Sequence, residues 1–454
     1  MLASRLFLST VALSAASSTL VWTESAHAEE EADGFKISGA MRLRYEVIDG
    51  QPRVGFNASD ELLNLRTNVL ARYRKADVDL ALEFYDSRVW GGRSGTPIST
   101  NEVNAFEPVQ FYIAKSFYNP SGAGSKLTVT AGRMMLNIGS RRLVAADDYR
   151  NTTNGYTGLR ADFVAGNRWK ATALYTLPQL RLPDSPGHVR SAKVRLDKES
   201  FDLVLWGGQI SRAMAWSGAM LELTYFHLGE RDAPGRPTRD RSLDTYGGRL
   251  IAEPQTSHFD YEVEGFHQSG TTSASLSTTA ARRSVAASFV HADVGYSFSG
   301  PWKPRLSVEY DRASGDRKGG KLRRFDTLFG MRRADLAPAG LYNALARTNI
   351  ETIGVRVEAT PSKRLDWFAA YRPMWLAARE DSFSATGVRD ATGNSGTFAG
   401  HQLEARLRYW LMPTRLRFEF DGLVLAKGRF LRNAPNAPAE KLTRYGSFNL
   451  TAGF

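Results

Sequence analysis

The sequence has 454 residues, 42% of them apolar and 11% aromatic, with a formal net charge of +12 and no cysteine. Without cysteine, the fold is held by hydrogen bonds and packing instead of disulfides, and no run after residue 28 approaches the ~18 apolar residues of a membrane helix. A basic balance favours nucleic acid or another polyanion as a partner, and the start of the chain decides between them.

The first 28 residues have the pattern of a secretory signal. Arg5 supplies a weakly positive start, residues 6–20 are mostly apolar and small, and Ala26-His27-Ala28 is a cleavage site of the A-x-A type. We expect the mature chain to begin at Glu29. A transmembrane anchor is a poorer explanation, because serines and threonines interrupt the short apolar run. Export in turn argues against a nucleic-acid partner.

Apolar and polar residues alternate with a period of two in segments from residue 35 to the end of the chain, which is the pattern of half-buried β-strands. In the first segment the apolar face runs from Phe35 to Val47, and the opposite face carries Lys36, Arg42, Arg44 and Glu46. The same alternation recurs at 65–74, 77–84, 305–310, 355–359, 403–409 and 416–421. We count roughly eighteen segments of about ten residues, the length at which a tilted strand crosses a bilayer.

The connectors between these segments are either short or long. Lys75-Ala76 and Pro361-Ser362-Lys363 are tight, whereas long polar connectors occupy 88–106, 178–199, 228–244, 269–284, 313–349 and 376–399. Short turns at one end and long loops at the other are typical of barrels in the outer membrane of Gram-negative bacteria. The sequence therefore predicts an all-β fold, a single transmembrane antiparallel β-barrel of about 18 strands over residues 29–454, with short periplasmic turns and long extracellular loops. Alternating apolar residues up to Phe454 predict a last strand that closes against the first.

A soluble β-sandwich is the alternative fold, because its strands also alternate. The number and length of the strands, the signal segment and interface-type aromatics such as Tyr45, Tyr225 and Tyr409 favour the barrel. A barrel of about 16 to 18 strands leaves an aqueous channel, so this fold predicts a pore that inward-folded loops must narrow.

The residues that alternate with the apolar ones are expected to face the lumen, and they are rich in arginine. Acids such as Asp79, Glu83, Glu309 and Glu404 share that face. One interpretation is a wall stiffened by ion pairs. The other is a positive conduit, because a narrow pore focuses potential and guanidinium binds carboxylate in a two-pronged manner. We expect both, with roughly a third of the arginines in purely structural pairs.

The stretch 132–160 is the strongest candidate for a segment that enters the pore. It joins two strand-like runs through a long connection that contains Arg141, Arg142, Arg150 and the neighbours Asp147 and Asp148. Loops of this length without structure of their own are uncommon and are often functional. We expect this loop to fold inward and place its arginines across the pore, with the aspartates as local counter-charges.

Several short motifs, taken together and in order, resemble the alginate-export family of outer-membrane barrels. They are Asn64-Leu65-Arg66, Glu83 with Asp86 and Arg88, Asn104-Ala105, Gly132-Arg133, Gly139, Arg142-Leu143-Val144, Arg150-Asn151-Thr152, Gly158-Leu159-Arg160, Phe325-Asp326-Thr327-Leu328-Phe329-Gly330 and Asn349. The resemblance implies an eighteen-stranded barrel with an electropositive pore and loops folded into the channel. It also implies passive, selective passage of an anionic polysaccharide such as alginate.

The predicted function is passive, anion-selective passage of an acidic polysaccharide or of other anionic solutes. A porin for small anionic or carbohydrate solutes is the alternative. The residues expected to line the pore or touch the solute are Arg42, Arg44, Arg66, Arg72, Glu83, Arg88, Arg133, Arg141, Arg142, Arg150, Arg160, Arg305, Arg356, Arg406 and Arg408. The expected partners are outer-membrane lipids and lipopolysaccharide, the anionic solute and periplasmic export proteins. No catalytic residue, metal or cofactor is expected.

The segment from Arg317 to Arg333 concentrates Lys and Arg around a Phe-Asp-Thr-Leu-Phe sequence. It is either an external loop that binds lipopolysaccharide phosphates or a gate or entrance funnel, and the resemblance favours the second interpretation. An enzyme is the rival class of function, because His267 and Ser269 end a strand as in barrel-embedded esterases, but no supporting polar partner is evident. A purely structural barrel or an adhesin would need no arginine-rich lumen.

Overall fold

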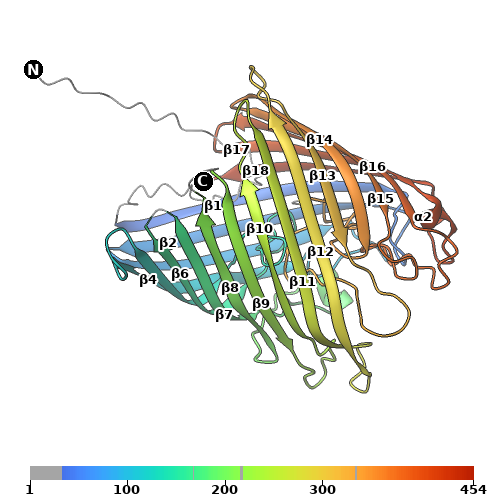
Figure 1. The fold of residues 1–454 in the computed structure, drawn as a ribbon, viewed down its shortest axis with the longest axis horizontal. Coiled ribbons are helices and arrows are strands. Elements are labelled where there is room, and N and C mark those ends of the chain that lie inside the picture. Colours follow the sequence, from blue (N-terminus) through green and yellow to red (C-terminus); the bar gives the residue numbers. More distant parts are fainter. Residues whose placement is uncertain (1–32, 167, 215–217, 333–334) are drawn as a thin grey trace, which may run out of the picture.

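The computed structural model describes residues 33–166, 168–214, 218–332 and 335–454. The signal segment with Ala26-His27-Ala28, and Arg333, lie outside the described residues. Eighteen strands form one antiparallel sheet that closes on itself, because β1 (Gly34–Asp49) pairs with both β2 (Ser59–Lys75) and β18 (Leu442–Gly453). Figure 1 shows the strands as a tilted ring around one lumen. The predicted all-β barrel and its strand number are confirmed.

The strands between β2 and β18 follow each other around the ring in chain order. Their bounds are β3 (Val78–Trp90), β4 (Asn104–Tyr118), β5 (Lys126–Met134), β6 (Tyr156–Ala165), β7 (Trp169–Pro178), β8 (Leu203–Ala213), β9 (Met220–Glu230), β10 (Ser242–Ala252), β11 (Phe259–Ser273), β12 (Arg282–Ser297), β13 (Arg305–Ala313), β14 (Ile350–Ser362), β15 (Leu365–Trp375), β16 (Phe398–Met412) and β17 (Leu416–Lys427). Two short helices, α1 (Pro186–Arg190) and α2 (Arg429–Asn433), lie in connections. No helix in the described ranges is long and apolar enough to cross a membrane.

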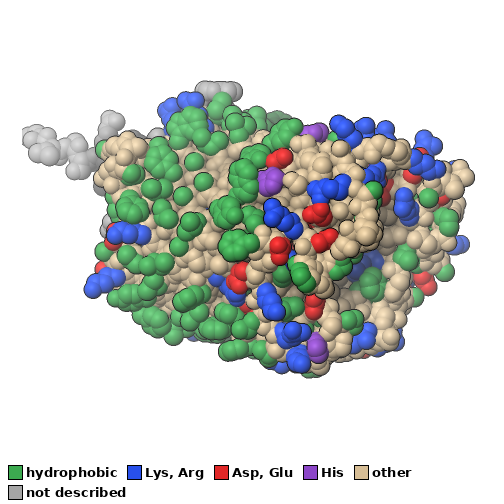
Figure 2. Space-filling view, turned by 90° about the horizontal axis from the view of Figure 1, so that it is seen from below, with side chains coloured by type: hydrophobic (Ala, Val, Ile, Leu, Met, Phe, Trp, Pro, Cys, Tyr) green, Lys and Arg blue, Asp and Glu red, His purple; other side chains and the backbone are tan. Residues whose placement is uncertain are grey.

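The alternation of residue types places apolar side chains on the outer wall and polar side chains in the lumen. On β1, Phe35 and Ile37 are exposed, whereas Arg44 and Glu46 are buried. Directly paired residues of antiparallel strands point to the same face, so the register extends this pattern around the ring. Figure 2 shows hydrophobic side chains over a broad area of the outer wall and charged side chains gathered toward one end. Such an apolar band is what holds a barrel in the outer membrane.

The connections at the two ends of the barrel differ in length, as predicted. The turns 76–77, 363–364 and 413–415 are short and lie at the end where β1 begins. The connections at the other end include 91–103, 135–155, 179–202, 314–349 and 376–397. In outer-membrane barrels the short turns face the periplasm and the long loops face outward.

The last residue of the chain completes the closure of the ring. The Gly39 amide donates to the Phe454 carbonyl and the Phe454 amide donates back to the Gly39 carbonyl, both at 3.0 Å. A Cβ atom on Gly39 would lie 2.5 Å from the Phe454 ring and 2.5 Å from the Asn68 carbonyl oxygen. Glycine is therefore needed where the first strand, the second strand and the chain end meet.

Polar pairs interrupt the apolar outer wall near the extracellular ends of several strands. In three of these outer polar pairs a tyrosine hydroxyl donates to a carboxylate of an adjacent strand: Tyr45 to Glu61, Tyr225 to Asp244 and Tyr310 to Glu351. In a fourth, Arg88 pairs with Asp86 at 2.9 Å. These pairs set a boundary on the outer wall between the apolar band and the extracellular rim.

Loop residues pack an apolar core inside the extracellular half of the barrel. Inward strand residues such as Leu62, Leu205 and Phe289 are buried in the same cluster as Leu336 and Tyr342, which belong to the connection between β13 and β14. The lumen is therefore filled from the extracellular side by folded loops, and these loops position the site.

Candidate functional site

The connection 135–155, here called the first inner loop, is fastened at one end to the wall formed by β1 and β2. The Arg42 guanidinium donates to the carbonyls of Asp148 at 3.0 Å and Arg150 at 2.7 Å, and Arg66 donates to the same Asp148 carbonyl at 3.0 Å. Arg44 donates to the Tyr149 carbonyl at 2.6 Å. The inward arginines of these strands thus bind the backbone of the loop that narrows the pore.

The other end of the first inner loop reaches the opposite wall. Ser140 donates to Glu264 of β11 at 2.7 Å, and Arg142 pairs with Glu264 at 2.9 Å and with Glu262. Because β11 stands across the eighteen-strand ring from β1 and β2, the loop crosses the lumen. The prediction that this stretch folds inward agrees with the structure.

The connection 314–349, here called the second inner loop, pairs with the first inside the barrel. The Ala145 amide donates to the Phe329 carbonyl at 3.2 Å, and the Phe329 amide donates to the Leu143 carbonyl at 2.9 Å. Asp335 accepts a two-pronged contact from Arg142, with both distances at 2.8 Å. The constriction is therefore built by two loops that act as one unit.

Asp335 is an acid held ionised inside this unit. Burial alone would raise the pKa of its carboxyl, but the adjacent guanidinium groups of Arg142 and Arg347 hold that pKa well below the usual range. The charge on Asp335 in turn anchors both arginines, so the pairing fixes the second inner loop to the first.

A cavity of about 380 Å³, here called the Arg42 cavity, lies below the constriction between the first inner loop and the wall of β1–β4 and β16–β18. Its charged lining comprises Arg42, Arg66, Arg415, Arg417, Glu83, Asp148 and Glu419. Asp148 already pairs with Arg141. Tyr85, Tyr149 and Trp410 contribute aromatic surface. The cavity thus combines an excess of guanidinium groups with flat aromatic rings.

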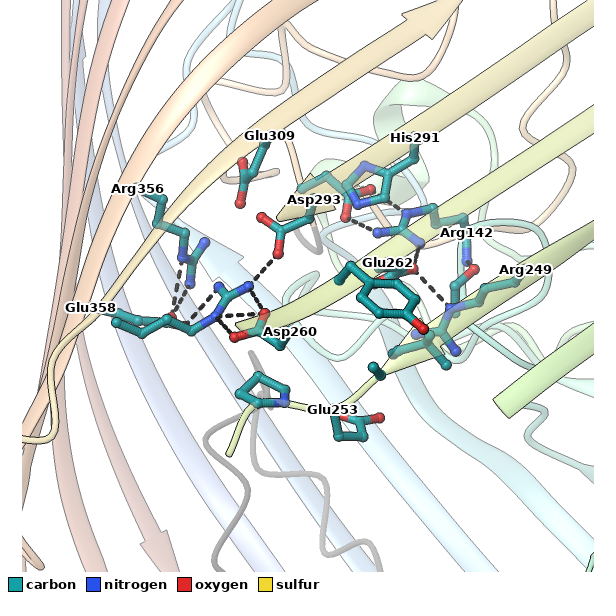
Figure 3. A pocket seen from close by; sticks show the side chains of 17 residues that line it. Arg142, Arg249, Glu253, Asp260, Glu262, His291, Asp293, Glu309, Arg356 and Glu358 are labelled. Carbon is teal, nitrogen blue, oxygen red and sulfur yellow. Dashed lines mark hydrogen bonds and ion pairs between the residues drawn. The ribbon is translucent and has the colours of Figure 1, made fainter. Parts of the chain in front are cut away.

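A smaller cavity of about 180 Å³, here called the Arg305 cavity, lies against the wall of β10–β14 (Figure 3). Carboxylates outnumber arginines in it: Glu253, Asp260, Glu262, Asp293, Glu309, Asp335 and Glu358 stand against Arg142, Arg249, Arg305 and Arg356. Arg305 pairs with Asp260, Asp293 and Glu358. The lumen is therefore not uniformly basic, because one side is acidic and the other side is basic.

The register places most of the predicted pore residues in the lumen or on the first inner loop. On the inward faces of strands lie Arg42, Arg44, Arg66, Arg72, Glu83, Arg160, Arg305, Arg356, Arg406 and Arg408, and on the loop lie Arg141, Arg142 and Arg150. Most of these arginines have a carboxylate within ion-pair distance, as Arg72 has in Asp79, Arg150 in Asp147 and Arg160 in Asp162. The share of structural pairs is larger than the third that the sequence led us to expect.

Arg88 and Arg133 lie on the outer wall, which corrects their assignment to the pore. Arg133 is paired in register with Phe111, whose side chain is 68% exposed on the outer wall, and residues paired in this way share a face. It binds Glu107 and Glu199 there. Arg88 is in phase with the exposed Leu80 and Trp90 of its own strand. Both arginines stabilise the rim and face away from the lumen.

Two residues of the site carry no signal in the sequence. The Tyr149 hydroxyl lies 3.1 Å from that of Tyr445 and 3.2 Å from the Ser447 hydroxyl, and Arg44 stacks on its ring at 3.9 Å. The second residue without a signal in the sequence is Asp335, which binds Arg142 of the first inner loop. Contacts between positions so distant in the chain have no local pattern by which sequence reasoning could find them.

Three buried groups, His291, Asp311 and Asp335, offer ligand atoms within 4.8 Å of one another, a spacing that suits a metal ion. Both oxygens of Asp335 already accept from Arg142, and Arg347 also binds this carboxylate. His291 Nδ1 lies 2.8 Å from Asp311. The cluster is therefore an ion-pair network that joins the wall to the second inner loop.

The residues of the rival esterase hypothesis lie on the outer wall. His267 packs against the Tyr246 ring with 5.5 Å between centroids, and Ser269 follows two residues later on the same face. Among the described contacts of His267 there is no hydrogen bond to Ser269. The pair lacks the nucleophile–base contact that such chemistry requires.

Comparison with known proteins gives one family and one fold. The sequence profile of the family described as alginate export matches residues 35–444. Solved structures that resemble the chain include Pseudomonas aeruginosa OccK2 (OpdF) in complex with glucuronate, at 11% identity and a TM-score of 0.56, with 94% of this chain and 99% of that chain covered. Acinetobacter baumannii OccAB2 (11%, TM-score 0.56, 92% and 98% covered) and P. aeruginosa OccK8 (OprE) (13%, TM-score 0.55, 92% and 98% covered) are similar too. No curated protein matches the sequence.

Proposed function

Because the chain belongs to the alginate export family and forms an outer-membrane barrel for solute passage, we propose that it is a selective channel for small acidic carbohydrates. The solutes are single sugar acids or short oligomers, and they pass through the Arg42 cavity. A carboxylate is recognised by guanidinium groups, which bind it with two parallel hydrogen bonds.

The Arg42 cavity carries this proposal. Arg42, Arg66 and Arg417 supply positive charge, and Tyr85 and Trp410 supply apolar rings on which the face of a sugar ring can pack. Sites for small molecules typically combine such apolar surface with a few placed polar groups. Glu83 accepts hydrogen bonds from Asn68 at 3.0 Å and from Gln110 at 2.6 Å. Its carboxylate oxygens are therefore already bound by amide groups of the wall.

The size of the solute follows from the two inner loops. They cross the lumen, pair with each other and pack the extracellular half with apolar side chains, so a small solute fits this channel better than a thick polymer does. Passage of an extended acidic polysaccharide is the second candidate. It is favoured by the inward arginines that continue around the wall from Arg356 through Arg406, Arg408 and Arg417 to Arg42.

The test is the ion selectivity of the channel in a planar bilayer. Under a KCl gradient the reversal potential should indicate anion preference, and glucuronate should block the chloride current. Replacing Arg66 and Arg417 with Gln should lower the anion-to-cation permeability ratio several-fold, because two of the lining charges are removed. The matched control is Arg312→Gln on the outer wall. A cation-selective wild-type channel that glucuronate leaves unaffected would contradict the proposal.

The same recording distinguishes the channel for small acids from the second candidate, a channel for an acidic polysaccharide. If an acidic polymer blocks the current more strongly per sugar unit than glucuronate does, and crosses to the other side, the polysaccharide is the solute. If only short acids cross, the small-solute channel stands.

A further inference from the structure

The second inner loop begins with an exposed basic tip at the extracellular rim, residues 316–323. Arg317, Lys318 and Lys321 are exposed, and Gly319 and Gly320 separate them. Within the described ranges, none of these three cations forms an ion pair. Three unpaired charges on five consecutive residues create a local positive potential that attracts anions.

The tip is held in place at both of its ends. The Asp316 carboxylate accepts from Arg283 of β12 at 3.0 Å and from the Arg323 amide at 3.2 Å. The Leu322 amide donates to the Ser284 carbonyl at 2.8 Å, and the Ala286 amide donates to the Leu322 carbonyl at 2.9 Å. The basic side chains therefore project from an ordered platform.

This tip encloses a cavity of about 300 Å³ together with the wall and a neighbouring loop. Its charged lining is Arg283, Asp316, Arg317, Lys318, Glu380 and Arg389. Asp316 is occupied by Arg283, and the Arg389 side chain donates to the Glu380 carbonyl at 2.9 Å. The charges that remain are mainly positive, and the volume of the cavity is at the lower end of the range for small-molecule sites.

One side of this cavity, formed by Arg283, belongs to the lumen face of the barrel wall. Arg283 is paired in register with Thr272 and is in phase with Val285 and Ala287, which are all buried inside the barrel. Lipopolysaccharide lies against the outer wall, where Arg282 points and pairs with Asp240. The orientation of Arg283 therefore favours a solute that is on its way into the channel over a lipid headgroup.

The same loop connects this cavity to the constriction. Just beyond the tip, Arg324 pairs with Asp381 at 2.7 Å, and Phe325 is buried in the lumen core. Phe329 then pairs with the first inner loop. Within a few residues the loop runs from the rim to the point where the channel narrows.

We propose that the basic tip is a capture site for carboxylate-bearing solutes that reach the channel at its extracellular mouth. This inference rests on the proposed function and adds to it a first binding site at the outer mouth. Capture at the outer mouth raises the local concentration of the acid above the constriction. It accelerates association from that side alone, because exposed charges act within roughly 8 Å at physiological salt.

The experiment removes the charge of the tip without touching the cavities below. In the variant Arg317→Ser, Lys318→Ser, Lys321→Ser, a uronate trimer is added to one side of a planar bilayer at a time, and the association rate is read from current blockages. We expect a drop of about tenfold for extracellular addition at about 0.1 M KCl, a much smaller drop at about 1 M KCl, and no change for periplasmic addition.

The matched control removes three exposed cations from another extracellular loop: Arg190→Ser, Lys193→Ser, Arg195→Ser. Equal losses in both variants, or equal losses from both sides, would overturn the capture site. An effect that appears only when lipopolysaccharide is in the bilayer would assign the tip to the lipid and would overturn it as well.

A binding measurement keeps the inference independent of conduction. Titration of the detergent-solubilised barrel with the uronate trimer should detect a salt-sensitive site that the tip variant lacks and the control keeps. If the wild type binds the trimer at the tip but passes no anion, the proposed function fails and the capture site remains. If the wild type conducts anions and the tip variant binds the trimer normally, the capture site fails alone.

Discussion

Arg142 joins three carboxylates that come from two parts of the molecule. Glu262 and Glu264 belong to β11, and Asp335 belongs to the second inner loop. The guanidinium is buried, so the charges around it have little solvent to screen them. Removing one partner of a buried ion pair is strongly destabilising, because the remaining charges stay buried without compensation.

We predict that Arg142→Met destabilises the barrel by about 3–5 kcal/mol, because three acids lose their partner. The measurement is the temperature at which the folded band converts to the unfolded band on a heat-modifiability gel. The control is Arg312→Met. The Arg312 side chain is 42% exposed, so loss of its pair with Glu351 should change the stability by less than about 1 kcal/mol. Equal midpoints for the two variants would contradict the structural role of Arg142.

Glu102 lies in the extracellular connection 91–103 and is buried. Burial raises the pKa of its carboxyl to about 7, although the Ser99 hydroxyl and the Ser99 amide, at 2.9 Å and 2.8 Å, donate to it and oppose the rise. The folded state thus prefers the protonated carboxyl, whereas the unfolded chain ionises near its ordinary pKa of about 4.3. The stability from this group is fully present below about 4.3 and is lost as the pH rises through about 7.

We predict that Glu102→Gln removes part of the pH dependence of stability between about 4.3 and about 7. An amide keeps the acceptor oxygen and cannot ionise, so the variant should be more stable than the wild type at neutral pH by up to a few kcal/mol. Thermal midpoints measured across this range, with exposed Asp184→Asn as the control, test the prediction. A wild-type slope retained in the variant would assign the effect to other groups, such as Asp197, whose pKa burial raises to about 6.

At the scale of single residues, the alternation predicts which arginines face the lumen wherever a strand is regular. The outward phase of Arg88 was present in the sequence, because Leu80, Leu82 and Phe84 precede it at the same parity. The assignment of Arg88 to the pore rests on its charge and on its place in a family motif, and it is wrong. Arg133 is a similar case, because Val129 lies four residues before it on the same face of the strand and indicates that this face points outward.

At the scale of elements, the two inner loops decide the width of the channel. A barrel of about 16 to 18 strands is wide enough for an aqueous channel when nothing fills it. The first inner loop crosses that space and is fastened at both walls by Arg42, Arg44 and Arg142. The strands form the conduit, and the loops narrow it.

We predict that replacing residues 139–150 with a short Gly-Ser linker raises the single-channel conductance several-fold and weakens anion preference. The deletion removes the segment that crosses the lumen and leaves the strands paired. Shortening the exposed connection 274–281 is the control and should leave the conductance unchanged. An unchanged conductance after the larger deletion would mean that the second inner loop closes the channel alone.

The inward fold of the first inner loop could be predicted from its length and its position between two strands. Its pairing with the second inner loop could not, because Val144 and Phe329 are far apart in the chain and neither carries a local signature. The acidic side of the lumen could be predicted only in part, because alternation placed Glu309 on the lumen face and left other acids out. Glu253 lies in a periplasmic turn and Asp335 lies on a loop, so strand alternation carries no information on them.

At the scale of the whole molecule, the barrel depends on a tight contact where its first and last strands meet. Gly39 lies against the Phe454 ring and the Asn68 carbonyl. The sequence predicted that the last strand would close against the first, and the pairing of β1 with β18 confirms it. The contact leaves no room for a side chain on Gly39.

We predict that Gly39→Val lowers the yield of heat-resistant folded barrel on refolding into detergent, because its side chain clashes with the closing residues. Adding Phe454→Ala should restore part of the yield, since one of the two obstacles is removed. The control is Gly187→Val, where a new Cβ meets open space. A normal yield for Gly39→Val would show that the closure adapts to a larger residue.

The outer polar pairs fix how deeply the barrel is immersed. A carboxylate on the outer wall, whether it binds a tyrosine hydroxyl or an arginine, needs water or headgroups around it, so the hydrocarbon must end below Asp86, Asp244 and Glu351. About nine residues of β3 lie between Val78 and Asp86, close to the ~9–11 that a tilted strand uses to cross a bilayer. The upper parts of the strands therefore rise above the hydrocarbon, and the mouth of the channel stands clear of the apolar layer.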